Sequence, residues 1–243
     1  MSGKDVLKVA SIFRTIQGEA TETGFPSVFV RLYGCNLNCS YCDTPQEKDG
    51  YKEMTLDSIV SRVKSYAIHR VCITGGEPLV QQEGVTTLCK MLVRDGYMVS
   101  IETNGSFDIL SLEERRNSCR GRSSWSYCMD MKLPSAGERE YHSCLRKIWK
   151  NILKMGSRDC VKFVVASEND IHLAMKIIED IAKVWVDSLP HCIPPAIFIS
   201  PVDKFGIQSD IAKKAAEAIM ELERVHGIPV RLQVQLHKVI GIL

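Results

Sequence analysis

The chain has 243 residues, a formal net charge of +2 and an apolar content of 45%. This size and composition predict a single domain over residues 1–243 with a sizeable hydrophobic core, and the near-neutral charge argues against nucleic acid as a partner. The first residues lack the apolar stretch of a signal peptide, and no apolar run reaches the length of a membrane span. We therefore expect a cytoplasmic protein that makes no use of a membrane.

Hydrophobic periodicity predicts alternating strands and helices. A short apolar segment at 9–13 and a loop rich in Thr, Gly and Pro at 20–26 precede an apolar strand at 27–33. Residues 43–52 are polar and irregular, and Thr55 caps an amphipathic helix. Further strands are expected at 69–74, 97–102, 126–130, 159–165, 196–199 and 230–235, and further helices at 80–94, 109–117, 141–154, 170–184 and 209–225. Such alternation predicts an α/β fold with a parallel sheet and helices packed outside it.

Three cysteines follow the strand at 27–33 with the spacing C-x3-C-x2-C, at Cys35, Cys39 and Cys42. Thiolates presented at the end of a strand can bind three irons of a cubane 4Fe–4S cluster. The next cysteine is Cys72, so the motif leaves the fourth iron open to an external ligand. The pattern therefore predicts a cluster that binds a small molecule, rather than a closed four-thiolate centre that only transfers electrons.

Other uses of these thiols fit the sequence less well. A zinc site usually needs a second Cys or His pair at a fixed spacing, and disulfides are not expected in a chain without export signals. Three free thiols in a reactive loop are the simplest alternative. The other seven cysteines lie mostly in apolar contexts and are expected to be buried free thiols: Cys72, Cys89, Cys119, Cys128, Cys144, Cys160 and Cys192.

Polar residues also follow several later strands, where α/β folds carry their chemistry. The segment Thr74-Gly75-Gly76-Glu77-Pro78 ends one strand. Its glycines allow a ligand close to the backbone, and Glu77 offers a carboxylate to an ammonium group, although the segment could be only a turn with proline at a helix start. Glu102 and Asn104 end the next strand, either as a polar wall of a ligand site or as an ordinary Asn-Gly turn.

Several charged residues have open interpretations. Asp130 and Lys132 form either a ligand contact or a surface ion pair, and Asp203 could accept ribose hydroxyls at a later strand end. Lys162 lies within a strand of the same series, without an assigned role. Arg31 lies in an apolar strand, and it either pairs with a structural carboxylate or binds an anionic substrate.

Together these elements resemble the 7-carboxy-7-deazaguanine synthases, a family of radical S-adenosylmethionine (SAM) enzymes in the deazapurine pathway to queuosine. The cysteine motif and Gly-Gly-Glu-Pro are common to the radical SAM superfamily, whereas the other segments make the match to this family close. The matching segments, spread over almost the whole chain, are Ile16-Gln17-Gly18-Glu19, Phe29-Val30-Arg31, Gly34-Cys35-Asn36, Cys42-Asp43-Thr44, Thr74-Gly75-Gly76-Glu77-Pro78, Glu102-Thr103-Asn104-Gly105-Ser106 and Gln235-Leu236-His237-Lys238.

The resemblance implies a partial, open βα barrel with mostly parallel strands, usually dimeric, that uses a 4Fe–4S cluster, SAM and Mg²⁺. It implies a carbon–nitrogen lyase that converts 6-carboxy-5,6,7,8-tetrahydropterin into 7-carboxy-7-deazaguanine and releases ammonia. An electron from a donor such as flavodoxin or ferredoxin would cleave SAM to a radical that takes a hydrogen from the substrate. Because the cofactors carry this chemistry, no side chain is expected to act as a further catalyst.

The resemblance also assigns residues, together with the strand-end candidates above. Cys35, Cys39 and Cys42 would bind the cluster, and Thr44 the Mg²⁺. The cofactors would be lined by Tyr41, Cys42, Asp43, Gly76, Glu77, Glu102, Asn104, Asp130, Met131, Lys132, Ser200, Pro201, Val202 and Asp203. The substrate would contact Ile16, Gln17, Gly18, Glu19, Arg31, Thr74 and Leu243.

Some features depart from the family pattern. Ala20 replaces a frequent glycine, Asp130-Met131-Lys132 replaces a frequent Ser-Pro-Lys, and residues 118–126 form a longer Arg- and Ser-rich surface excursion. Two other functions stay open. An activase of a glycyl-radical enzyme would share both superfamily motifs but would need a protein-docking face, and an electron-transfer iron–sulfur protein would not bind SAM. The apolar tail at 239–243 is expected to pack onto the body, at the substrate pocket or below the sheet.

Overall fold

The computed structural model describes residues 5–43, 50–119, 124–189, 191–202, 209–223 and 230–242. Nine strands form one sheet in the order β3-β1-β2-β4-β5-β6-β7-β8-β9. The strands are β1 (Val6–Ile16), β2 (Pro26–Leu32), β3 (Lys52–Thr55), β4 (Arg70–Gly75), β5 (Met98–Thr103), β6 (Ser126–Met131), β7 (Cys160–Val165), β8 (Ala196–Pro201) and β9 (Val230–Leu232). The α-helices are α1 (Leu56–Lys64), α2 (Gln82–Arg94), α3 (Leu112–Ser118), α4 (Glu138–Ile152), α5 (Glu168–Ser188), α6 (Asp210–Leu222) and α7 (Leu236–Val239), and the 3-10 helices are η1 (Ala20–Glu22), η2 (Pro78–Gln81) and η3 (Pro134–Ala136).

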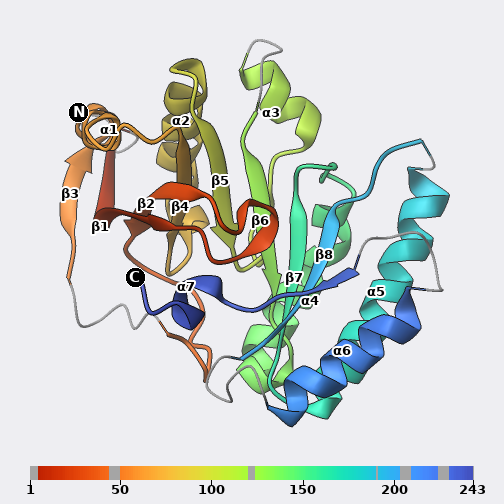
Figure 1. Cartoon of the computed structure of the whole chain (residues 1–243). Coiled ribbons are helices and arrows are strands. Elements are labelled where there is room, and N and C mark those ends of the chain that lie inside the picture. The colour runs from red at the N-terminus through yellow and green to blue at the C-terminus, as the bar shows by residue number, and fades with distance from the viewer. Residues whose placement is uncertain are drawn as a thin grey trace.

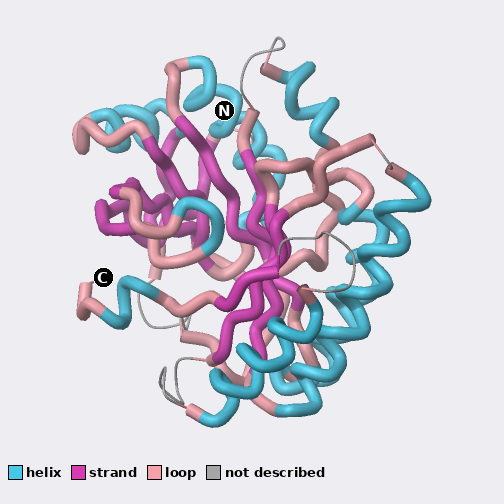
Figure 2. Tube along the Cα trace, turned by 45° about the vertical axis from the view of Figure 1, so that its right-hand side comes forward, coloured by secondary structure: helices cyan, strands magenta, loops and turns pink. Residues whose placement is uncertain are grey.

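Strands β2, β4, β5, β6, β7, β8 and β9 follow one another in the sheet and pair in parallel. Strand β1 is antiparallel to its two neighbours, β2 and β3. Within the described residues the sheet begins at β3 and ends at β9 without closing. Figures 1 and 2 show the larger helices packed around the outside of the curved sheet. This arrangement confirms the predicted α/β class and the partial, open barrel with mostly parallel strands.

The helices begin where short polar side chains can cap them. The side chain of Thr55 accepts a hydrogen bond from the Ser58 amide at the start of α1, and Ser111 forms a reciprocal capping box with Glu114 at the start of α3. Apolar and more polar residues alternate along the middle parallel strands, as expected when successive side chains point to opposite faces: Val99 and Ile101 of β5 are buried in the core, whereas Ser100 and Glu102 lie on the other face. The apolar side chains of the strands and the inner helix faces form one large core cluster that extends from Leu7 to Ala215.

The elements differ from the predictions mainly where pairing partners are distant in sequence. Strand β1 runs from Val6 to Ile16 instead of 9–13, because it pairs along its length with β2 and at its start with β3. Strand β3 begins at Lys52, the last residue of the stretch expected to be irregular, and fills the gap before the cap at Thr55, where no strand is predicted. The last strand stops at Leu232 and not at 235, because residues 233–235 form no regular structure before the short helix α7. Residues 120–123 of the surface excursion lie outside the described part of the chain.

The carboxyl-terminal segment returns to the beginning of the chain. It leaves β9, crosses in front of the strands and reaches the loop after β1 (Figure 1). The Leu236 amide donates to the Gly18 carbonyl at 3.1 Å, which fixes this return. None of the helices in the described residues is long and apolar enough to cross a membrane.

Candidate active site at the carboxyl ends of the strands

The three motif cysteines lie on the loop that follows β2. Cys35 and Cys42 are exposed, Cys39 is half-buried, and all three are free thiols. Among the described residues no three acidic, His or Cys side chains converge on one metal ion. The C-x3-C-x2-C spacing of the three cysteines along the sequence stays the basis for the predicted cubane cluster, in which each thiolate would bind a different iron. Burial raises the pKa of Cys39 to about 11, so cluster binding has to displace its proton.

Neighbouring elements hold the cysteine loop in place. The Glu77 amide donates to the Gly34 carbonyl at 2.9 Å, and the Ser40 amide donates to the Ala136 carbonyl at 2.9 Å. The Asn38 amide donates to the carboxylate of Glu140, a buried residue of α4, at 3.1 Å. The loop is therefore fixed by its backbone, which leaves the thiols available as ligands. This donor set fits the predicted iron–sulfur cluster.

Asn36, between the first two cysteines, connects the loop to the end of β5. Its side-chain amide donates to Ser106 Oγ at 2.9 Å, and its side-chain oxygen accepts from Asn104 Nδ2 at 3.0 Å. The Asn-Gly turn is thus both a tight turn and a contact of the cysteine loop. Gly105 has a φ of +72°, and a Cβ there would lie 2.8 Å from the Met129 side chain, so the turn requires glycine.

Glu77 is fully buried, and its carboxylate points into the protein. It accepts hydrogen bonds from the Leu79 amide, the Thr103 hydroxyl and the Asn104 amide at 2.9, 2.8 and 2.6 Å. Burial raises the pKa of Glu77 to about 7, although these three donors oppose the shift. Glu77 therefore positions the Asn104 turn, and its contact with a ligand ammonium group stays a prediction.

Glu102 gathers residues from three elements. Its carboxylate accepts from Gln17 Nε2 at 3.1 Å and from Thr74 Oγ1 at 2.7 Å. Gln17 is buried after β1, whereas Thr74 ends β4 and Glu102 ends β5. Residues predicted to contact the substrate are thus brought together around one carboxylate.

A second group of charges joins β6, β7 and the loop after β1. Lys162 forms ion pairs with Glu19 and, at 3.6 Å, with Asp130, which also accepts from Lys132 at 2.7 Å. Burial opposes charge on both carboxylates, but the lysines outweigh it and lower the pKa values of Glu19 and Asp130. The Asp130–Lys132 pair is therefore largely buried, not a surface pair.

Polar atoms without partners point to places where ligands could bind. The Arg31 Nε, the Tyr41 hydroxyl and the Asp130 Oδ1 are buried and have no hydrogen-bond partner in the described residues. Buried polar groups are normally satisfied. The Arg31 guanidinium lies 5.4 Å from the Phe13 ring centroid. Within the described residues no carboxylate forms an ion pair with it, so substrate binding by Arg31 stays a prediction. Lys132 lies 5.7 Å from the Tyr41 ring centroid.

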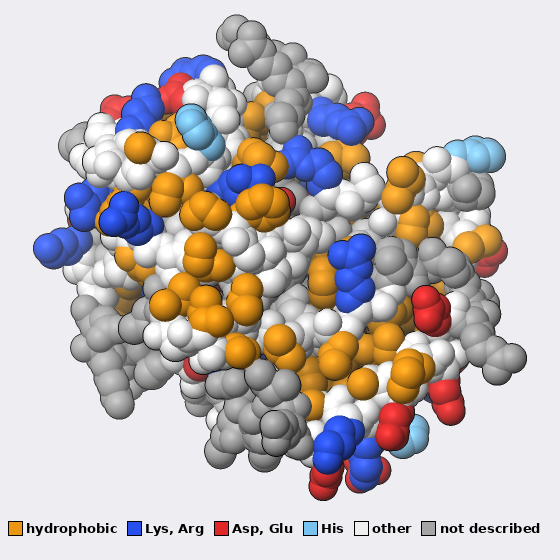
Figure 3. Space-filling model, in the orientation of Figure 1, with side chains coloured by type: hydrophobic (Ala, Val, Ile, Leu, Met, Phe, Trp, Pro, Cys, Tyr) orange, Lys and Arg blue, Asp and Glu red, His pale blue; other side chains and the backbone are white. Residues whose placement is uncertain are grey.

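The carboxyl-terminal segment covers the loop after β1. Gln235 Nε2 donates to Glu19, and Lys238 Nζ lies 2.8 Å from Asp43 Oδ2. The His237 ring packs so closely on Gly18 that a Cβ there would lie 1.9 Å from Nδ1, so only glycine fits. The segment packs onto the body through these polar contacts, but Val239, Ile240 and Ile242 stay exposed, contrary to the expectation that the apolar tail is buried. Figure 3 shows hydrophobic side chains gathered around this segment.

The other predicted residues are placed less distinctly. The Met131 side chain is buried in the core, Ser200 is buried at the end of β8, and Ile16, Gly76, Pro201 and Val202 are half-buried. Thr44, Asp203 and Leu243 lie outside the described residues. The sequence did not suggest roles for Asn36, Glu140 and Lys162. Of these, only Lys162 carried a signal, as a charge within an apolar strand.

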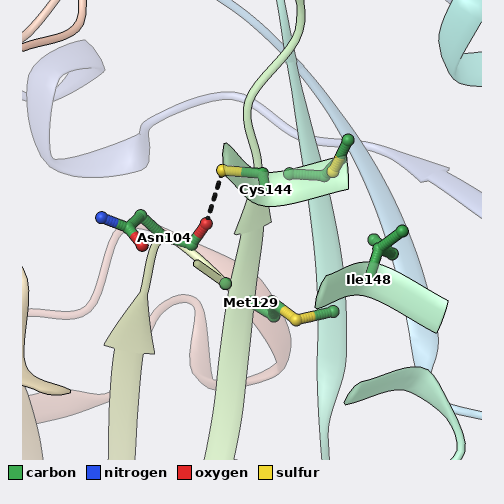
Figure 4. A pocket seen from close by; sticks show the side chains of 6 residues that line it. Asn104, Met129, Cys144 and Ile148 are labelled. Atoms are coloured by element: carbon green, nitrogen blue, oxygen red, sulfur yellow. Dashed lines mark hydrogen bonds between the residues drawn. The ribbon is translucent and has the colours of Figure 1, made fainter. Parts of the chain in front are cut away.

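Two hollows lie next to this network. One lies behind the Asn104 turn between β6 and α4, where Cys144 Sγ lies 2.9 Å from the Asn104 carbonyl (Figure 4), and it has no room for a water molecule. The other is lined by Gln17, Glu102, Cys128 and Cys160, and its volume is only about 10 Å³. Both are far below the roughly 300–1,000 Å³ of typical ligand pockets, so neither is a ligand pocket.

The remaining cysteines are mostly buried, as predicted. Cys72, Cys89, Cys128, Cys144 and Cys160 are buried free thiols. Cys119 is half-buried, and Cys192 is exposed, so the prediction was wrong for Cys192.

Known proteins resemble this chain in sequence and in fold. The radical SAM superfamily matches residues 29–115. The chain is 38% identical to the 7-carboxy-7-deazaguanine synthase of Methanospirillum hungatei, over 97% of this chain and 86% of that protein. It is 37% identical to the Clostridium acetobutylicum enzyme of the same name, over 96% and 95%. The crystal structure of QueE from Escherichia coli shares the fold, with a TM-score of 0.65 and 21% identity over 96% of this chain and 95% of that one.

Proposed function

Because this chain belongs to the 7-carboxy-7-deazaguanine synthase family of radical SAM enzymes, we propose that it converts 6-carboxy-5,6,7,8-tetrahydropterin into 7-carboxy-7-deazaguanine with release of ammonia. Membership of the radical SAM superfamily implies a 4Fe–4S cluster and SAM. The product places the enzyme in queuosine and 7-deazapurine biosynthesis. The activase function, which would require a protein-docking face, is not favoured.

One observation carries the proposal. The thiol loop and the residues matched to substrate binding belong to a single site, although they come from different elements: Asn36 bonds to Asn104 at the end of β5, where Glu102 holds Gln17 and Thr74. An iron–sulfur protein that only transfers electrons has no need of such a polar site beside its cluster.

The residues can be assigned by their chemistry. Cys35, Cys39 and Cys42 would hold the cluster, whose chemistry with SAM supplies a radical that abstracts hydrogen from the substrate. Arg31, whose buried Nε has no partner in the described part of the chain, would bind the substrate carboxylate through charge-assisted hydrogen bonds. Gln17, fixed by Glu102, would orient the pterin ring. The carboxyl-terminal segment would cover the bound substrate and exclude water.

We also propose a Mg²⁺ ion bound by Thr44. Mg²⁺ prefers six oxygen ligands and usually keeps several waters. The Thr44 hydroxyl and the substrate carboxylate would therefore be enough to hold the ion, with water as the remaining ligands. Its test is Thr44→Ala, which should raise the Mg²⁺ concentration needed for half-maximal turnover and leave the iron content unchanged. Unchanged Mg²⁺ dependence would contradict this assignment.

Three further proposals concern partners and location. The exposed apolar residues near the carboxyl terminus, Leu232, Val234, Val239, Ile240 and Ile242, support a homodimer that covers them, and the molar mass in solution tests this. The electron donor would be a small acidic redox protein such as flavodoxin or ferredoxin. We also propose a cytoplasmic location, because such a reductant would have to be present in the same compartment.

The experiment that tests the function is anaerobic reconstitution of the cluster, followed by incubation with SAM, dithionite, Mg²⁺ and the carboxytetrahydropterin. Mass analysis should show 7-carboxy-7-deazaguanine, with many products per SAM consumed if hydrogen returns to the cofactor. A matched pair of variants locates the carboxylate site. Arg31→Gln should raise KM about 10-fold or more, whereas Lys64→Gln, which removes an exposed pair with Asp95 outside the site, should leave KM unchanged. Reconstituted protein that cleaves SAM but leaves the pterin intact would overturn the proposal.

A further inference from the structure

Four charged side chains of alternating sign form a chain that we call the charge bridge: Glu19, Lys162, Asp130 and Lys132. Lys162 contacts Glu19 on one side and Asp130 on the other, and Asp130 contacts Lys132. Their side chains are 9%, 11%, 18% and 14% exposed in that order. The bridge is electrically neutral as a whole, which allows four charges to be buried together.

The two ends of the bridge reach the two halves of the active site. Glu19 lies in the loop that carries Gln17, and it also accepts from Gln235 of the carboxyl-terminal segment. Lys132 lies 5.7 Å from the ring centroid of Tyr41, which stands between two cluster cysteines. One end thus belongs to the predicted substrate side, and the other belongs to the predicted SAM side.

Lys162 is the residue that joins these halves. It comes from the middle of β7, and 143 residues separate it from Glu19. Charges interact strongly where water is excluded. If Glu19 moves, the Lys162 ammonium group that it shares with Asp130 moves with it, and the electrostatic potential at Asp130 changes. Asp130 Oδ1 is buried and has no hydrogen-bond partner among the residues that the structure describes, so this oxygen can accept a hydrogen bond from a ligand.

We propose that Lys162 is a positioning residue that couples the two binding sites, so that SAM and the pterin carboxylate each strengthen the binding of the other. The inference rests on the proposed function, because it assumes those two ligands. Substrate that orders the Glu19 loop would fix Lys162, and Lys162 would in turn fix Asp130 and Lys132 for SAM. By linkage the effect must be equal in both directions.

The test measures binding without turnover. Reconstituted protein with its cluster oxidised is titrated anaerobically with SAM in a calorimeter, with and without saturating pterin-6-carboxylate, a fully oxidised probe. We expect the pterin to lower the SAM Kd of the wild-type protein by about 5-fold or more, within the usual range of coupling between sites. The ratio of the SAM Kd without the pterin to the SAM Kd with it should fall to about 2 or less in Lys162→Gln. Lys162→Arg, which keeps the charge, should restore part of the wild-type ratio. Lys147→Gln, which removes an exposed pair with Asp108, should keep the wild-type ratio.

The outcomes separate coupling from simple structural support. If Lys162 only stabilises the fold, Lys162→Gln will weaken both ligands alike and leave the ratio unchanged, which would overturn the inference. Independent binding of both ligands to the wild-type protein would also overturn it while the proposed function stands. Failure of the wild-type protein to bind the oxidised pterin would overturn the inference, whereas the proposed function is decided separately by turnover of the carboxytetrahydropterin. If Lys162→Gln does not fold, Glu19→Gln cuts the same bridge from its other side, and a wild-type ratio in that variant would overturn the inference as well.

Discussion

The Nζ atom of Lys238 lies 2.8 Å from the Oδ2 atom of Asp43, although 195 residues separate them in the chain. The contact ties the carboxyl-terminal segment to the end of the cysteine loop. Both side chains are partly exposed, so the pair contributes less than about 1 kcal/mol to the free energy of unfolding. The contact matters because it holds the carboxyl-terminal segment beside the cysteine loop.

Lys238→Gln should therefore raise the KM for the pterin substrate several-fold while the urea midpoint and the iron content stay close to wild type. Steady-state kinetics and urea unfolding measure the two effects. Lys213→Gln is the matched control, because it removes another exposed pair, with Asp210 on α6. Equal KM values for the two variants would show that the segment needs no anchor at Asp43.

Cys39→Ala should abolish the visible absorption of the cluster and all cleavage of SAM, since two thiolates cannot hold the cluster. Iron analysis and detection of 5′-deoxyadenosine measure these losses after anaerobic reconstitution. Cys192→Ala removes an exposed thiol outside the site and should retain both properties. An active Cys39→Ala protein with a full complement of iron would overturn the assignment of the cluster ligands.

The buried carboxyl of Glu77 predicts a dependence of stability on pH. Burial raises its pKa from 4.5 to about 7, so the folded protein holds a proton that the unfolded chain has lost. Its contribution to the free energy of unfolding is therefore greatest below pH 4.5 and falls by up to about 3 kcal/mol as the pH rises through 7. Urea unfolding of the apoprotein between pH 5 and pH 8 measures this fall. Glu77→Gln should remove it, and an unchanged slope in that variant would contradict the prediction.

Asp159 should be one of the most sensitive positions for stability. Its carboxylate accepts from both terminal nitrogens of Arg115 at 2.8 and 2.6 Å and from the amides of Tyr127 and Gly156, in a fully buried site. Asp159→Asn leaves the buried Arg115 charge uncompensated and should lower the free energy of unfolding by about 3–5 kcal/mol. Asp95→Asn breaks the exposed pair with Lys64 and should leave the urea midpoint close to that of the wild-type protein. Similar urea midpoints for the two variants would count against this ranking.

Several features of this protein follow from short stretches of sequence alone. The cysteine spacing, the cap at Thr55 and the alternation of strands with helices depend on local periodicity and on residue type. The same alternation places polar strand ends such as Glu102 and Thr74 on one edge of a parallel sheet, because parallel strands point the same way. In the structure these two residues are in contact, with the Thr74 hydroxyl donating to the Glu102 carboxylate.

Other features arise only when the chain folds. The periodicity that indicates a strand does not say which distant strand it pairs with, so β3 and the full length of β1 were missed. The direction of a side chain at a strand end depends on its neighbours, and the amides of Leu79 and Asn104 turn Glu77 inward. The pairing of Glu19 with Lys162 spans 143 residues. A charge in an apolar strand indicates that some partner must exist, because an unpaired buried charge is costly, but only the packing of β7 against the loop after β1 decides which carboxylate it is.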